Sequence, residues 1–183
     1  MKFDLGGIGR GRDCKTVNLI KNCDIQSDIL DLDSFCKDDS VDEFLMTHTY
    51  EHISPAVIPA FLKKILKKLK LTGCLRILHT DAKKTIDLYN KSIIDFKSLR
   101  SIVFTPLDVR LRCFEETQKD LQSHQFMWGV DELKEELLFY GFKDVQEFDA
   151  GSWTFDINNY FANDKMTSFH GVKIPNLGIV AYK

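Results

Sequence analysis

A short alternating segment that runs into a cluster of glycines opens the chain and most constrains its fold. Within residues 2–9, apolar and charged side chains alternate, and then Gly6, Gly7 and Gly9 follow. Alternation with a period of two predicts a strand, and glycine allows positive φ and close approach of a ligand to the backbone. A strand that ends in such a loop is typical of nucleotide pockets in open α/β sheets. The same pattern also fits a flexible turn.

Composition places the chain among globular proteins. Its 183 residues are 44% hydrophobic and 28% charged, which suits one domain with a sizeable core, so we expect residues 1–183 to form a single domain. The net charge of -2 argues against nucleic acid as a partner. Five cysteines without CxxC spacing favour free thiols in a reducing compartment. Without a long apolar run or a signal peptide, we expect a cytoplasmic protein that does not bind a membrane.

Segments with strand and helix character alternate along the chain. Strand patterns cover residues 2–5, 16–20, 24–30, 41–48, 74–80, 142–148 and 176–182. Helix patterns begin at Ser54 as the cap with Pro55 in the first helical position, at Asp81, and at Asp131. We expect Gly73 to cap the end of the first helix, whereas residues 98–128 give no clear pattern. The alternation predicts an α/β fold with a mostly parallel sheet and helices on both faces.

Four stretches, taken in order, give the chain a resemblance to a known family. They are the glycine loop at residues 4–9, the acidic segment at 38–44, the Thr-His-Thr-Tyr-Glu-His-Ile segment at 47–53 and the turn at 69–77. Together they resemble the class I S-adenosylmethionine-dependent methyltransferases, and within them the methyltransferase type 11 group. The resemblance covers most of the chain. It implies a Rossmann-like, doubly wound, mostly parallel seven-stranded sheet with an antiparallel last strand, and S-adenosyl-L-methionine as the cofactor.

The resemblance also implies a set of cofactor contacts. They fall on Gly6, Gly7, Gly9, Asn18, Asp28, Ile29, Thr47 and His48. The glycines would approach the methionine part, Asp28 would accept the adenine amine, and Thr47 and His48 would flank the sulfonium. The chain departs from the family near the end of its second strand, where Ile20 stands in place of an acidic residue. Asn18 is a candidate substitute there, although a neutral amide is a weaker acceptor than a carboxylate.

Methyl transfer from a sulfonium mainly needs positioning of the two reactants, and a hydroxyl acceptor also benefits from a general base. His124, in the variable region before a helix, is the first candidate for this base. Asp81, directly after a strand, is the second. His48, Glu51 and His52 have the H-x-x-E-H order of some zinc enzymes. Because Ser54 and Pro55 would begin the helix only after them, we expect no metal site.

Two functions of different kinds remain open. The first is methylation of a small hydroxyl-bearing acceptor, with a sugar or glycan precursor suggested by analogy to the resembled group. The second is a degenerate protein that keeps the fold as an interaction module, which Ile20 and the irregular glycine pattern favour. The aromatic residues Trp153, Phe155, Tyr160, Phe161 and Phe169 would stack on a sugar ring or cover the core. The absence of G-x-G-x-x-G argues against a nicotinamide oxidoreductase.

Overall fold

The computed structural model describes residues 1–7, 13–19, 23–104, 123–155 and 172–183. Its strands are β1 (Lys2–Leu5), β2 (Lys15–Asn18), β3 (Ile25–Gln26), β4 (Val41–Thr47), β5 (Leu69–Thr80), β6 (Asp144–Glu147), β7 (Ser152–Phe155) and β8 (Val172–Tyr182). Its helices are η1 (Leu32–Ser34), η2 (Tyr50–His52), α1 (Ile58–Lys68), α2 (Ala82–Asn90), α3 (Phe96–Phe104) and α5 (Val130–Phe139).

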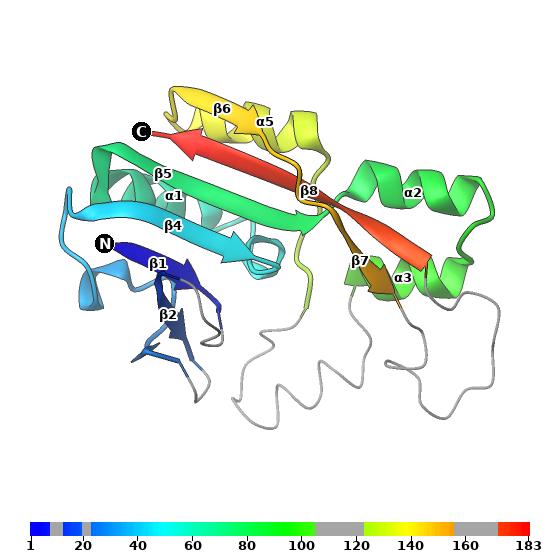
Figure 1. Cartoon of the computed structure of the whole chain (residues 1–183), viewed down its shortest axis with the longest axis horizontal. Helices are drawn as coiled ribbons and strands as arrows, with labels where there is room; N and C mark the ends of the chain where they lie inside the picture. The colour runs from blue at the N-terminus through cyan, green and yellow to red at the C-terminus, as the bar shows by residue number, and fades with distance from the viewer. Residues whose placement is uncertain (8–12, 20–22, 105–122, 156–171) are drawn as a thin grey trace.

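The strands form one mixed sheet in the order β3-β2-β1-β4-β5-β8-β6, and β7 pairs with β8 beside this path (Figure 1). Strands β1 to β5 run parallel to one another. Strand β8 runs antiparallel to both β5 and β6. This confirms the expected mostly parallel seven-stranded sheet with an antiparallel last strand. Because the chain runs outward from β1 to β3 and then returns beside β1 as β4, the strand order reverses between β1 and β4.

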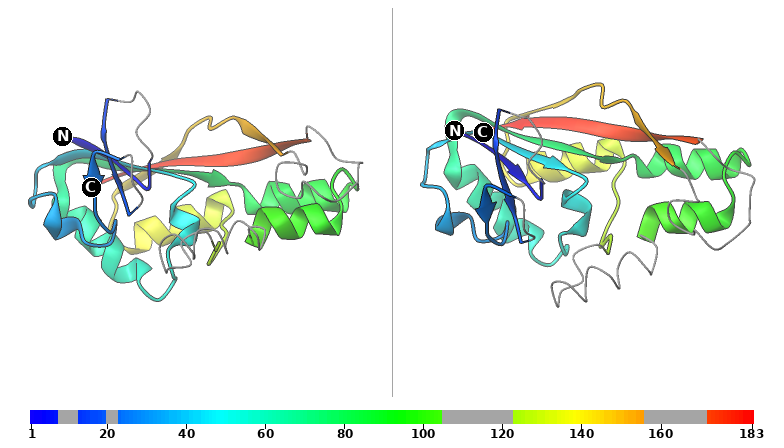
Figure 2. Two further views of the ribbon diagram at one scale, coloured as in Figure 1. Left: turned by 90° about the horizontal axis from the view of Figure 1, so that it is seen from below. Right: turned by 60° about the horizontal axis from the view of Figure 1, so that its bottom comes forward.

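The main hydrophobic core lies between the sheet and the helices on one of its faces. Figure 2 shows α1 and α5 on the same side of the sheet. Phe3 of β1 and Phe44 of β4 are opposite each other in the ladder, and their stacked rings have centroids 5.9 Å apart. Leu62 and Ile65 of α1 are fully buried against this layer. Alternate strand residues therefore face the helices, as the period-two patterns predicted.

The structure corrects both ends of the first helix. α1 begins at Ile58 with Val57 as its cap residue, and a proline occupies its first turn. Pro59 lacks an N–H and is tolerated only there, so a helix that began at Pro55 would place Pro59 in a less favourable position. Gly73 is not a helix cap: the helix ends at Lys68, and Gly73 lies inside β5. A Cβ on Gly73 would lie 2.8 Å from the carbonyl oxygen of Val41, where the pairing of β4 and β5 is irregular.

A second, smaller core holds one end of the molecule together. Helices α2 and α3 lie beside β7 and the first half of β8, away from α1 (Figures 1 and 2). The buried residues of this core are Ile94, Ile102 and Ile174, with three partly buried neighbours. The sequence reading missed α3 altogether. Its aromatic ends, Phe96 and Phe104, are exposed, so its apolar pattern is weaker than that of a fully packed helix.

The structure also describes four of the cysteines and the lengths of the helices. Within the described residues, the structure shows no disulfide at Cys14, Cys23, Cys36 or Cys74, and Cys113 lies outside those residues. Among the described helices, none is both long enough and apolar enough to cross a bilayer.

Candidate functional site

Most of the residues singled out from the sequence lie at one edge of the sheet. Because β1 to β5 are parallel, their carboxyl ends meet there. Gly6 follows β1, Asn18 ends β2, Asp28 follows β3, Thr47 ends β4 and Asp81 follows β5. Open α/β sheets bind ligands at this edge, beside the point where the strand order reverses. Here that point lies between β1 and β4, next to the glycine loop.

The glycine loop is tightly packed against the ends of β1, β2 and β4. Gly6 has a φ of +87°, and its N–H donates to the carbonyl oxygen of Val17 at 2.8 Å. A Cβ on Gly6 would lie 2.4 Å from Oγ1 of Thr49, and one on Gly7 would lie 2.4 Å from a carboxylate oxygen of Asp4. Gly6 therefore needs glycine for both its backbone conformation and its packing, whereas a side chain at Gly7 would require the Asp4 side chain to move. Gly9 lies outside the described residues.

Asn18 holds this loop from the neighbouring strand. Its Nδ2 donates to the carbonyl oxygens of Gly6 at 2.7 Å and of Gly7 at 3.4 Å. Because β2 ends at Asn18, this side chain stands at the carboxyl end of the strand, and Ile20 lies outside the described residues. The amide thus uses its donors on the loop, a task that a carboxylate in the same place could not perform.

Asp28 and Ile29 follow the short strand β3. Oδ1 of Asp28 accepts a hydrogen bond from the backbone N–H of Leu30 at 3.0 Å, which fixes the turn after the strand. Ile29 is partly buried and packs against the main core. The turn therefore presents a carboxylate and an apolar side chain at the same edge as the glycine loop.

His48 continues the edge after β4 in an unusual backbone conformation. Its φ is +49°, a region that residues other than glycine rarely adopt and that is found at functional sites. Its N–H donates to the carbonyl oxygen of Leu78 at 2.7 Å, so the pairing of β4 with β5 extends to this residue. The conformation turns the chain directly into η2, and Nδ1 of His48 lies 3.4 Å from Oε1 of Glu51.

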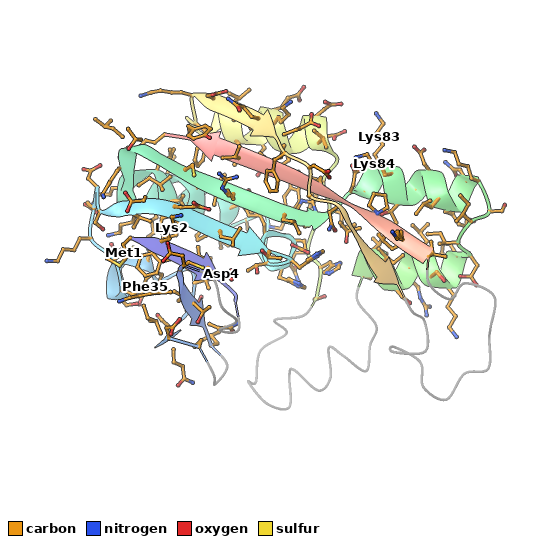
Figure 3. All side chains as sticks on the ribbon, in the orientation of Figure 1. Met1, Lys2, Asp4, Phe35, Lys83 and Lys84 are labelled. Atoms are coloured by element: carbon orange, nitrogen blue, oxygen red, sulfur yellow. The ribbon has the colours of Figure 1, made fainter. Side chains whose placement is uncertain are left out.

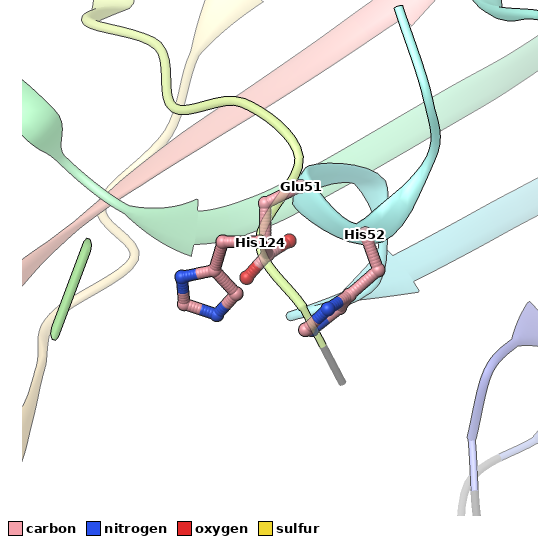
Figure 4. A group of neighbouring side chains, drawn as sticks. All are labelled: Glu51, His52 and His124. Carbon is pink, nitrogen blue, oxygen red and sulfur yellow. The ribbon is translucent and has the colours of Figure 1, made fainter. Parts of the chain in front are cut away.

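Glu51, His52 and His124 form a compact cluster beside this turn. One candidate ligand atom from each lies within 4.8 Å of the others, and Figure 4 shows the Glu51 carboxylate between the two imidazole rings. The ring centroids of His52 and His124 are 4.8 Å apart. The segment that carries His124 is held here because the N–H of Gln125 donates to the carbonyl oxygen of Glu51 at 2.7 Å.

The cluster combines a buried, charged carboxylate with the neutral imidazole of His124. Burial alone would raise the pKa of Glu51, but the hydrogen bond from His48 and the neighbouring histidines outweigh it and lower the pKa to about 2. Burial, followed by the charge of His52, lowers the pKa of His124 to about 4. Burial also lowers the pKa of His79, which is fully buried at the end of β5. At neutral pH, Glu51 is therefore charged and both His79 and His124 are neutral.

Asp81 is engaged in holding the start of α2. Its Oδ1 accepts from the N–H of Lys84 at 3.0 Å, and its Oδ2 lies 3.0 Å from Nζ of the same lysine. The carboxylate is buried, whereas the lysines at the start of α2 project from the outer side of that helix (Figure 3). The prediction that Asp81 begins a helix is confirmed. Both carboxylate oxygens of Asp81 are thus engaged with Lys84.

A pocket of about 160 Å³ lies elsewhere on the sheet. It is lined by Lys2, Phe3, Asp13, Cys14, Glu43 and Leu45. Lys2 begins β1, so the pocket lies away from the carboxyl edge, and the ion pair between Lys2 and Glu43 stands at its wall. Sites for drug-sized ligands enclose about 300–1,000 Å³. We therefore place the candidate site at the carboxyl edge and not in this pocket.

The joining of Glu51, His52 and His124 is the feature that sequence reasoning missed. The H-x-x-E-H spacing was visible, but His124 lies 72 residues after His52, and nothing in the local pattern connects them. His79, near the end of β5, lies beside Trp128, with ring centroids 5.7 Å apart. The predicted stacking residues from Tyr160 to Phe169 lie outside the described residues.

Comparisons with known proteins agree with this arrangement at the level of the fold. No protein-family model matches the sequence, and no curated protein matches it significantly. The chain is similar to a solved S-adenosylmethionine-dependent methyltransferase from Archaeoglobus fulgidus, with 17% identity, a TM-score of 0.57, and coverage of 100% of this chain and 85% of the other. It is also similar to 1,6-didemethyltoxoflavin-N1-methyltransferase from Burkholderia thailandensis, solved with 1,6-didemethyltoxoflavin and S-adenosylhomocysteine, with 16% identity, a TM-score of 0.54, and coverage of 100% and 70%. The protein has the Rossmann-like fold of these enzymes.

Proposed function

We propose that this protein is an S-adenosylmethionine-dependent methyltransferase that methylates a hydroxyl group of a small acceptor. The observation that carries the proposal is the glycine loop at the reversal of strand order. There, Gly6 adopts a φ of +87°, and the donors of Asn18 hold the loop carbonyls. The fold and the resemblance of the sequence motifs support the same activity. The sugar or glycan precursor as acceptor is part of the proposal and rests on the resemblance alone.

The residues at this edge suit an adenosyl cofactor. Gly6 and Gly7 carry no side chain, so a ligand can approach the backbone of the loop closely. The carboxylate of Asp28 offers an acceptor for the adenine amine, and Ile29 offers an apolar surface to a ring. Thr47 and His48 stand at the end of β4, the strand next to β1. When bound, S-adenosylmethionine supplies an activated methyl group on a sulfonium.

We place the acceptor hydroxyl next to His48, beside the cluster of Glu51, His52 and His124. In that position, Nε2 of a neutral His124 can accept its hydrogen bond and orient an oxygen lone pair. The pKa of about 4 makes His124 a weak proton acceptor at neutral pH. The contribution of His124 is therefore orientation of the hydroxyl more than full removal of its proton.

Isothermal titration calorimetry with S-adenosylhomocysteine tests the cofactor site. We expect binding in the micromolar range and loss of at least about tenfold in affinity for Asp28→Ala, since an adenine hydrogen bond to a charged group contributes about 1.5–3 kcal/mol. Asp31→Ala is the matched control, because this nearby aspartate is exposed and its side chain makes no cap hydrogen bond. Absence of any binding at millimolar ligand would refute the enzyme and favour the interaction module.

Transfer of a labelled methyl group tests the acceptor. The wild-type chain should label sugars or glycan precursors with free hydroxyls and should leave matched amines and thiols unlabelled. The His124→Ala variant should lower kcat while leaving S-adenosylhomocysteine binding unchanged, because His124 is assigned to the acceptor. Labelling of amines in preference to hydroxyls would overturn the assignment of the acceptor atom but leave the cofactor site standing.

A further inference from the structure

We propose that Glu51, His52 and His124 bind one divalent transition-metal ion at the carboxyl edge of the sheet. The three side chains come from η2 and from the segment before α5, which the backbone hydrogen bond of Gln125 to Glu51 holds together. Their candidate ligand atoms already lie within 4.8 Å of one another (Figure 4). Tetrahedral ligands at zinc distances lie about 3.4 Å apart, so small side-chain rotations complete the site.

The hydrogen bonds of His52 and His124 occupy Nδ1 of each ring, so Nε2 is available for a metal. Nδ1 of His124 lies 2.9 Å from the carbonyl oxygen of Val103, and Nδ1 of His52 lies 3.2 Å from that of Ser123. A carbonyl oxygen only accepts, so each Nδ1 carries a proton, and Nε2 is the nitrogen of each ring whose lone pair can bind a metal. Metal-binding histidines almost always donate their other N–H to a carbonyl or carboxylate in this manner.

The buried carboxylate supplies an independent reason to expect a cation. Glu51 is 2% exposed, and among the described residues no donor reaches either of its oxygens with good hydrogen-bond geometry. The contact with Nδ1 of His48 is long, at 3.4 Å, and that side chain is 37% exposed. A buried carboxylate is costly unless it is paired or binds a metal. Nε2 of His79 is likewise buried without a partner in the described part of the chain, although a third imidazole is not required.

The donor set selects the class of metal. Two imidazole nitrogens and one carboxylate oxygen suit Zn²⁺, Mn²⁺, Fe²⁺ or Co²⁺ and leave coordination positions open for a further ligand. Mg²⁺ and Ca²⁺ prefer sets made of oxygen alone and should bind weakly here. If the proposed methyltransferase activity holds, Nε2 of His124 would bind the ion in place of the acceptor hydroxyl, and an open position on the ion would bind the acceptor oxygen and lower the pKa of its hydroxyl. That consequence rests on the proposed function, but the metal site does not.

Metal binding by the isolated chain, without cofactor or acceptor, is the test. The protein is stripped with chelator and titrated by calorimetry with Zn²⁺, Mn²⁺ and Mg²⁺. We expect one equivalent of Zn²⁺ or Mn²⁺ per chain and little binding of Mg²⁺. Saturation to a hundred times the dissociation constant should raise the melting temperature by about 5–10 °C. No transition-metal binding tighter than millimolar would overturn the proposal, whatever the result with S-adenosylhomocysteine.

Three variants locate the site on these residues. Glu51→Gln, His52→Ala and His124→Ala should each weaken Zn²⁺ binding by at least about 100-fold, since even outer partners of metal ligands contribute about 10–100-fold. Glu135→Gln is the matched control, because Glu135 is exposed on α5. Wild-type affinity in all three variants would place the ion elsewhere and refute the assignment.

A measurement on the unmodified chain covers the case in which a variant does not fold. Substoichiometric Mn²⁺ should broaden the imidazole NMR signals of His52 and His124 first, because paramagnetic broadening falls steeply with distance from the ion. Signals of both histidines that stay sharp when one equivalent of Mn²⁺ has bound would overturn the proposal.

Discussion

Gly6 offers a direct test of how the glycine loop is built. Two separable penalties oppose a side chain there. An alanine at a φ of +87° would cost about 1–2 kcal/mol in backbone strain. Its Cβ would also lie 2.4 Å from Oγ1 and 2.7 Å from Cγ2 of the buried Thr49, and such overpacking costs about 1–3 kcal/mol. Gly6→Ala should therefore lower the free energy of unfolding by about 2–5 kcal/mol.

Gly151 provides the control for the backbone part of this cost. It also has a positive φ, +62°, but no atom lies within 4 Å of the place where its Cβ would stand. Gly151→Ala should therefore cost only the strain, about 1–2 kcal/mol. Urea unfolding followed by far-UV circular dichroism gives both values, with equal m-values expected for the two variants.

A double-mutant cycle with Thr49 isolates the steric part. Thr49→Ala alone loses the hydrogen bond from its Oγ1 to the carbonyl oxygen of Thr47, worth about 1 kcal/mol. In the presence of Thr49→Ala, Gly6→Ala should cost about 1–3 kcal/mol less than it does in the wild-type chain. The reasoning fails if Gly6→Ala is no more costly than Gly151→Ala, or if the cycle gives no coupling.

Three further predictions use the same unfolding assay. Asn18→Asp should destabilise by about 1–3 kcal/mol, because a carboxylate would face the carbonyl oxygens of Gly6 and Gly7 without a donor; Asn18→Ala should cost less. Trp128→Phe should cost about 1.5–3 kcal/mol, because the indole N–H donates to the half-buried carboxylate of Glu136, and an unchanged stability would contradict this. Burial holds the pKa of His124 near 4 in the folded chain against 6.5 when unfolded. Protonation of His124 therefore destabilises the folded chain. The free energy of unfolding keeps its full value above pH 6.5 and falls by up to about 3 kcal/mol as the pH drops from 6.5 through 4. Measured in chelator, His124→Gln should show a shallower decline over that range, and a decline as steep as that of the wild type would count against it.

Local patterns sufficed for the strands of the main core but not for the exact ends of elements. Strand β4 spans nearly the predicted residues, because its alternation reflects one face against the helices and one face away from them. The first helix was misplaced because two prolines compete for its start, and only the tertiary contacts of Ile58 and Phe61 decide between them. Gly73 looked like a cap because a glycine after an amphipathic run is also what a close approach of two strands requires.

In the candidate site, too, some residues could be predicted from the sequence and others could not. Residues directly after strands, such as Gly6 and Asp28, were predictable, since parallel strands bring their carboxyl ends to one edge. The cluster of Glu51 with His124 was not predictable. It depends on a hydrogen bond between segments 74 residues apart along the chain, from Gln125 to Glu51, and no sequence periodicity encodes such a contact. The role of Asp81 was ambiguous from sequence because a carboxylate after a strand serves equally as a helix cap.

The small core of Ile94, Ile102 and Ile174 affects how the chain unfolds locally. Three buried isoleucines hold that end, whereas β4 and β5 belong to the large core. Amide hydrogens of α2 and α3 should therefore exchange through a local unfolding that leaves the sheet intact, with a lower free energy than global unfolding. The carbonyl of Val103 that orients His124 belongs to α3. The candidate site thus spans the seam between two folding units, and a ligand that fixes His124 should slow exchange across α3.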